Sequence, residues 1–141
     1  MLFEFYHSDI PHKYRNAHIG VLEMMSIFIA LRLWHCSIIN KRIRIMCDNQ
    51  SVLHVLNSGR GKDIDMLHLA RQIMILCARN NAEIRLVYIE SKENILADSL
   101  SRWNLGSSYK RRFYQHINNI SGSFKDRVIS NTIFDDSDYE C

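Results

Sequence analysis

The sequence has few of the features that mark secreted, membrane-spanning or disulfide-rich proteins. Its four cysteines show no CxxC spacing and no secretory leader precedes them, which argues against a zinc ribbon or a disulfide framework. The most apolar stretch, residues 21–34, is interrupted by Glu23 and Arg32. It is also shorter than the roughly 20 residues that a transmembrane helix needs. We therefore expect an intracellular protein in a reducing compartment, with no membrane partner.

The composition is that of one ordinary globular domain with a basic body. Of the 141 residues, 47% are hydrophobic and 23% are charged. Four of the 15 acidic residues follow Phe134, so residues 1–134 hold 18 basic and 11 acidic side chains, a formal charge of +7. Such a charge favours a polyanionic partner such as nucleic acid, although many basic domains bind none.

The periodicity of apolar residues predicts alternating strands and helices. Alternation of polar with apolar residues indicates strands, and apolar residues at helical spacing indicate helices. The predicted segments are strands at 2–6, 42–47 and 83–89, and helices at 18–36, 49–58, 63–80 and 94–102. This order is typical of an α/β fold.

The last part of the chain carries a weaker signal. Residues 109–119, YKRRFYQHINN, mix bases with aromatic residues, which suits base stacking and phosphate contact. The same pattern fits an amphipathic surface helix, which we favour. The acidic residues 135–140 are expected to form a solvated tail.

Asp48 is the first residue that we associate with chemistry. It stands where the strand 42–47 passes directly into a helix, and open α/β sheets bind their ligands at the carboxyl ends of strands. The alternative is that Asp48 only caps the helix, because Asp is a favoured N-cap residue.

Two further carboxylates lie in helices among apolar neighbours. Glu23 is expected to face a gap to solvent, a cation or a metal, unless it belongs to a thin polar stripe. Asp98 lies four residues after Asn94 and therefore on the same helix face. If Glu23, Asp48 and Asp98 converge, their repulsion favours Mg²⁺, and a pair of such ions can hydrolyse a phosphodiester. Three acids among fifteen can also be picked out by chance.

Three ordered motifs resemble a known family. They are HIGVLEMMSIFIAL, IRIMCDNQSVLHVLNSG and IRLVYIESKENILADSLSR. Together they resemble the type 1 ribonuclease H domain of retrotransposon reverse transcriptases, especially DIRS-like elements. There the pattern is roughly H-I-N-x-L-E-L, D-N-x-x-V and H-I-x-G-x-x-N-x-x-A-D-x-L-S-R. The resemblance covers about residues 1–103 and implies a ribonuclease H-like mixed sheet flanked by helices.

The resemblance also implies roles for individual residues. Glu23, Asp48 and Asp98 match the family's catalytic metal ligands, with Mg²⁺, or Mn²⁺ as an alternative, as the cofactor. Asn49 and Gln50 would lie near the substrate backbone, and Asn94 would help to position the last helix. The implied function is a nuclease that cuts the RNA strand of an RNA–DNA hybrid.

The chain departs from the family at its start. The family has a further aspartate on the first strand, with two more strands between it and the helix glutamate. Asp9 lies only fourteen residues before Glu23, too close to substitute for it. We therefore expect residues 1–103 to be a partial domain that lacks the first two strands, and residues 104–141 to be an extension. We expect a fragment, a degenerate gene copy, or the tail of a polyprotein whose upstream polymerase segment supplies the missing strands, and a nuclease that is impaired as it stands because the first catalytic aspartate is absent.

A second departure concerns the histidine that precedes the last motif in many of these domains. Tyr88 stands in its place, and Glu90-Ser91 stands where the family usually has a turn that contains glycine.

Two alternatives to a hybrid-cutting nuclease stay open. The first is a noncatalytic nucleic-acid-binding or assembly module that keeps the fold, and the second is a nuclease of the same fold that acts on DNA.

Overall fold

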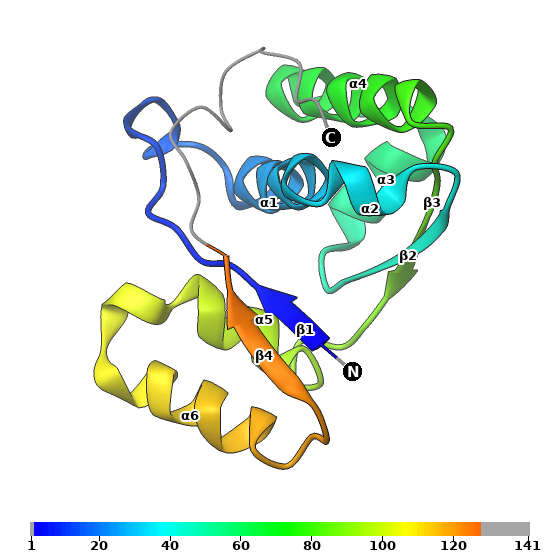
Figure 1. Ribbon diagram of the computed structural model, residues 1–141. Coiled ribbons are helices and arrows are strands. Elements are labelled where there is room, and N and C mark those ends of the chain that lie inside the picture. Colours follow the sequence, from blue (N-terminus) through cyan, green and yellow to red (C-terminus); the bar gives the residue numbers. More distant parts are fainter. Residues whose placement is uncertain (1, 128–141) are drawn as a thin grey trace. The chain divides into compact units, whose positions relative to one another are not determined.

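The structure, a computed structural model, describes residues 2–127 and contains two compact units (Figure 1). One unit comprises residues 11–89, and the other combines residues 2–10 with residues 90–127. Each unit has its own pair of parallel strands together with helices. The α/β class predicted from the sequence is confirmed.

The 11–89 unit is built on strands β2 (Arg42–Cys47) and β3 (Glu83–Tyr88), which pair in parallel. The register places Ile43 opposite Ile84 and Ile45 opposite Leu86, so one face of the pair is apolar. Residues of β2 alternate between exposed and partly buried, as expected when one face of a strand is covered. The helices of this unit supply that cover.

Four α-helices belong to the 11–89 unit, after a short 3₁₀ turn at His12–Tyr14. They are α1 (Ile19–Leu33), α2 (His35–Ile38), α3 (Gln50–Ser58) and α4 (Ile64–Arg79). The three longer helices pack on one another, and α3 and α4 also pack on β3. In the described part of the chain, no helix has both the length and the apolar character needed to cross a bilayer.

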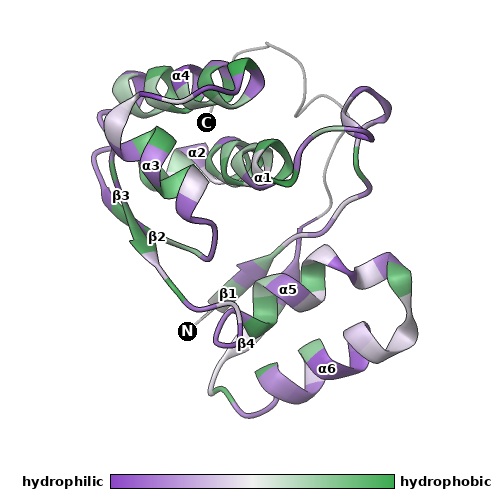
Figure 2. Ribbon diagram, turned by 180° about the vertical axis from the view of Figure 1, so that it is seen from behind, coloured by the Kyte–Doolittle hydropathy of each residue, from purple (hydrophilic) through white to green (hydrophobic). Residues whose placement is uncertain are grey.

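The core of this unit explains the apolar character of α1. Val21 and Met24 of α1, Val52 of α3 and Ile73 of α4 are almost completely inaccessible to solvent. Figure 2 shows that α1 is hydrophobic along most of its length, as a helix contacted by other helices should be. The helix predicted over 18–36 is interrupted at Trp34, where the backbone leaves the helical conformation.

Side-chain caps fix the starts of α3 and α4. The Asn49 carboxamide oxygen accepts hydrogen bonds from the backbone N–H groups of Ser51 and Val52, at 2.9 and 3.3 Å. Asp63 caps α4 in the same way by accepting from Met66 at 3.0 Å. Because Asn49 is the N-cap of α3, the alternative that Asp48 caps this helix is wrong.

Replacing Asn49 by alanine should destabilise the protein by about 1 kcal/mol, because two backbone N–H groups of α3 lose their acceptor. Urea unfolding followed by circular dichroism measures this change. Ser51→Ala is the matched control, since only the backbone of Ser51 takes part in the cap. An unfolding midpoint for Asn49→Ala equal to that of the control contradicts the capping role.

The second unit is built on strands β1 (Leu2–Phe5) and β4 (Ser123–Asp126), which are also parallel. Helices α5 (Ile95–Ser101) and α6 (Ser107–Ile117) pack together, joined by a 3₁₀ turn at Trp103–Leu105. Buried Trp103, Phe113 and Ile117 form its core, with partly buried side chains packed against them from Phe5, Leu96, Leu100 and Phe124.

Helix α6 is amphipathic, as we favoured for residues 109–119. Phe113 and Ile117 are buried, while the rest of the helix is exposed or partly exposed and mostly hydrophilic (Figure 2). Helix α6 packs on α5, and β4 pairs with β1. Both contacts cross the boundary predicted after residue 103. That boundary stays a prediction. The acidic segment 135–140 lies outside the described residues.

Candidate metal site

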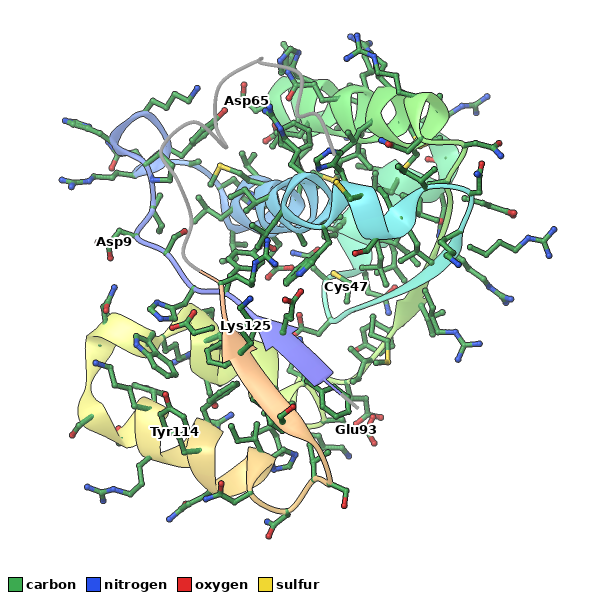
Figure 3. The ribbon with its side chains drawn as sticks, viewed as in Figure 1. Asp9, Cys47, Asp65, Glu93, Tyr114 and Lys125 are labelled. Carbon is green, nitrogen blue, oxygen red and sulfur yellow. The ribbon has the colours of Figure 1, made fainter. Side chains whose placement is uncertain are left out.

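Two of the three predicted carboxylates meet in the 11–89 unit. Glu23 lies in the second turn of α1, and Asp48 directly follows the last residue of β2. One carboxylate oxygen of each lies with the Cys47 sulfur in a group whose atoms are all within 4.8 Å of one another. Figure 3 labels Cys47, at the end of β2. Residues that are 25 positions apart in the sequence thus form a compact set of metal-binding atoms.

The negative charges of Glu23 and Asp48 are not fully balanced by nearby positive charge. Partial burial raises the pKa of Glu23, and the nearby charge of Asp48 raises it further. A hydrogen bond from the Asn49 side chain acts in the opposite direction. Among the described residues, no lysine, arginine or histidine forms an ion pair with Glu23 or Asp48. A bound divalent cation would supply the missing positive charge, so these residues fit a metal ion.

Cys47 is a member of the group that was not predicted from the sequence. Its thiol is buried, lies 4.0 Å from Glu23 Oε2 and 3.9 Å from the Asn49 carbonyl oxygen, and can donate to either. Burial raises the pKa of this thiol above its ordinary value. In the sequence Cys47 fits the apolar alternation of the strand 42–47, which hides a role as a ligand. Its adjacency to Asp48 at the end of a strand was the available signal.

Asp98 belongs to the other unit and makes different contacts. Its carboxylate accepts from Arg102 Nε at 3.1 Å and from Arg112 Nη2 at 3.0 Å. These two ion pairs link α5 with α6. In this arrangement both carboxylate oxygens of Asp98 are already paired with guanidinium groups, whereas Glu23 and Asp48 have no such partner among the described residues.

The predicted substrate residues have the following surroundings. Gln50 is the first residue of α3 and is exposed, next to the Asn49 cap. Asn94 occupies the N-cap position of α5, but its side chain accepts no capping hydrogen bond. Its backbone carbonyl accepts from the Asp98 N–H at 3.0 Å. The substrate roles of Asn49 and Gln50 and the positioning role of Asn94 stay predictions.

Comparison of the chain with protein-family models, with curated proteins and with solved structures finds no match.

In metal-free protein, Glu23 should lower the free energy of unfolding as the pH rises above the unfolded-state pKa of 4.5. The pKa of Glu23 is higher in the folded state, so between the two pKa values the folded protein binds more protons than the unfolded chain. Stability therefore falls as the pH rises through this window. Glu23→Gln should remove that part of the pH dependence.

Urea unfolding in the presence of a chelator, from about pH 4 to about pH 7, measures this effect. Glu83→Gln is the matched control, because Glu83 is an exposed residue of the same unit that pairs with Arg42 on the surface. The control separates the effect at Glu23 from the general effect of removing one carboxyl from this unit. If stability depends on pH in Glu23→Gln as it does in the unaltered protein, the pKa of Glu23 is not raised in the folded state.

Proposed function

We propose that this chain carries the partial active site of a ribonuclease H-like nuclease that cuts the RNA strand of RNA–DNA hybrids. The observation that carries the proposal is the convergence of Glu23 and Asp48 from two separate elements onto one point. Asp48 also stands at the carboxyl end of a parallel strand, where open α/β sheets place their ligands. The fold proposed with it is a ribonuclease H-like mixed sheet that lacks its first two strands.

In this proposal Glu23 and Asp48 hold Mg²⁺ or Mn²⁺, and the family resemblance assigns the same role to Asp98. The chemistry that such an ion would supply is activation of a water and stabilisation of the leaving oxygen of the phosphodiester. The Asn49 side chain orients the Glu23 carboxylate through the hydrogen bond between them. Gln50, exposed at the start of α3, is available to bind the sugar–phosphate backbone of the substrate.

The role of Asp98 requires an exchange of partners. Its carboxylate oxygens now accept from Arg102 and Arg112, so a metal ion has to replace at least one guanidinium group. The fourth ligand of the family has no counterpart in this sequence. We propose that an upstream polymerase segment of the same polyprotein supplies it, together with the missing strands.

The decisive test compares magnesium-dependent cleavage by this chain with cleavage by a version extended upstream. The substrates are an RNA–DNA hybrid, duplex DNA and duplex RNA of one sequence. We expect the extended protein to cut the RNA strand of the hybrid and to leave both other duplexes intact. An extended protein that cuts none of them overturns the nuclease proposal, and preferential cutting of DNA favours the DNA-acting alternative.

A noncatalytic nucleic-acid-binding module is the second candidate, and α6 is the observation that favours it. Lys110 and Arg111 are exposed on this helix beside the half-exposed Tyr114. Lys110 also lies over the ring of Trp103, and Arg102 over the ring of Tyr109. Exposed bases interleaved with aromatic rings suit a nucleic-acid strand. Salt-sensitive hybrid binding without cleavage by the extended protein would support this function.

A further inference from the structure

A buried thiol shares the site of the two carboxylates. Cys47 is 7% exposed, and its sulfur lies 4.0 Å from Glu23 Oε2. The same sulfur belongs to the group that includes an Asp48 oxygen, with all three atoms within 4.8 Å of one another. The other free buried cysteine, Cys77, lies on α4 and is not part of this group.

These separations are close to those of a metal-bound set. Zinc bonds of about 2.3 Å to sulfur and about 2.1 Å to oxygen place neighbouring ligand atoms about 3.5 Å apart in a tetrahedral site. The observed separations of up to 4.8 Å need a closure of about 1 Å, which side-chain torsions can supply.

The ligand types decide which ion is preferred. Mg²⁺ is a hard cation that binds oxygen and keeps much of its water, whereas thiolate ligands select softer metals such as zinc. A sulfur beside two carboxylates therefore discriminates against Mg²⁺. Three protein ligands also leave a fourth zinc position open for water or for an oxygen of a bound molecule.

We propose that, in the chain without the upstream segment, Cys47 joins Glu23 and Asp48 as a ligand of a thiophilic divalent cation, with Zn²⁺ preferred over Mg²⁺. On binding, the thiol proton passes to solvent as the sulfur–metal bond forms, and no oxidation is involved. The inference concerns the metal preference of the same site as the proposed nuclease centre. It depends on Glu23 and Asp48 forming a metal site, but it does not require cleavage.

The test is a titration of the full reduced chain with Cd²⁺, a thiophilic stand-in for Zn²⁺ whose bond to a thiolate absorbs in the ultraviolet. Cys47→Ser and Cys77→Ser each remove one buried cysteine and keep the other three. We expect Cys77→Ser to bind Cd²⁺ as the unaltered chain does. Cys47→Ser should lose this absorption and at least about tenfold in affinity, since even an outer-sphere partner contributes that much.

A second variant keeps the test informative if Cys47→Ser does not fold. Glu23→Gln retains all four cysteines, so its Cd²⁺ affinity should fall by at least about tenfold only if the bound thiolate belongs to this site. Zn²⁺ should displace Cd²⁺ from the unaltered chain, and a large excess of Mg²⁺ should not.

Two results overturn the inference: Cys47→Ser or Glu23→Gln binding Cd²⁺ like the unaltered chain, or Mg²⁺ displacing the ion readily. Both are separable from failure of the nuclease proposal. If the chain binds no Cd²⁺ through Cys47 but its extended form cuts hybrids with Mg²⁺, only the proposal of a thiolate ligand is wrong. If the chain binds Cd²⁺ as expected but the extended form never cuts, only the nuclease proposal is wrong.

Discussion

Replacing Asp48 by asparagine should reduce magnesium-dependent cleavage of an RNA–DNA hybrid by the upstream-extended protein at least about a hundredfold. Asparagine has nearly the same shape as aspartate but lacks its charge, so the metal loses an ionised oxygen ligand. The fold should be retained, because Asn49 and not Asp48 caps α3. Initial rates of cleavage of a labelled RNA strand at saturating hybrid measure the effect.

Asp65→Asn is the matched control for this substitution. Asp65 is an exposed residue in the first turn of α4 (labelled in Figure 3), so its replacement should leave cleavage unchanged. Asp48→Asn should still bind the hybrid as tightly as the unaltered protein, or slightly more tightly, because a negative charge near the phosphates is removed. Cleavage by Asp48→Asn at the unaltered rate removes Asp48 from the metal site.

Replacing Phe113 by alanine should destabilise the second unit by about 3–5 kcal/mol, the usual effect of removing a buried aromatic ring. Phe113 is 2% exposed, and its ring centroid lies 4.8 Å from that of Phe5 and 5.6 Å from that of Trp103. The neighbouring rings are held by different elements and cannot all close the cavity. Urea unfolding followed by fluorescence of Trp103, in a chain with Trp34 replaced by phenylalanine, reports on this unit.

Leu105→Ala provides the comparison for Phe113→Ala. Leu105 is 74% exposed in the 3₁₀ turn that precedes α6, so its truncation should change stability by no more than about 0.5 kcal/mol. Equal midpoints for the two variants contradict the core assignment of Phe113.

The sequence predicts the strands and helices of the 11–89 unit because their apolar residues recur at clear strand or helix spacing. Strands β2 and β3 alternate polar with apolar residues, and α3 ends at Gly59 in the left-handed conformation that glycine favours. The interruption at Trp34 has no comparable signal. Strand β4, Ser-Phe-Lys-Asp, has one apolar residue, and its pairing with β1 depends on tertiary contacts that no local pattern shows.

The candidate site is also predictable in part from the sequence. A carboxylate at a strand end and another within a buried helix are visible in the sequence, and the structure brings Glu23 and Asp48 together. The contribution of Cys47 is harder to foresee, because cysteine is also an ordinary apolar residue in a strand. The pairing of Asp98 with Arg112 depends on the packing of α5 on α6, and only the partner four residues away, Arg102, follows from helix spacing.

The parallel pairing of β1 with β4 has a consequence for the order of events during synthesis. Leu2 is opposite Ser123, so the two strands are separated by about 120 residues, and forming the pair closes a long loop at an entropic cost. All of residues 11–89, which form a unit of their own, are synthesised before β4. Until then β1 exposes Phe3 and Phe5 without the partner strand, so a nascent chain stalled after residue 100 should bind chaperones.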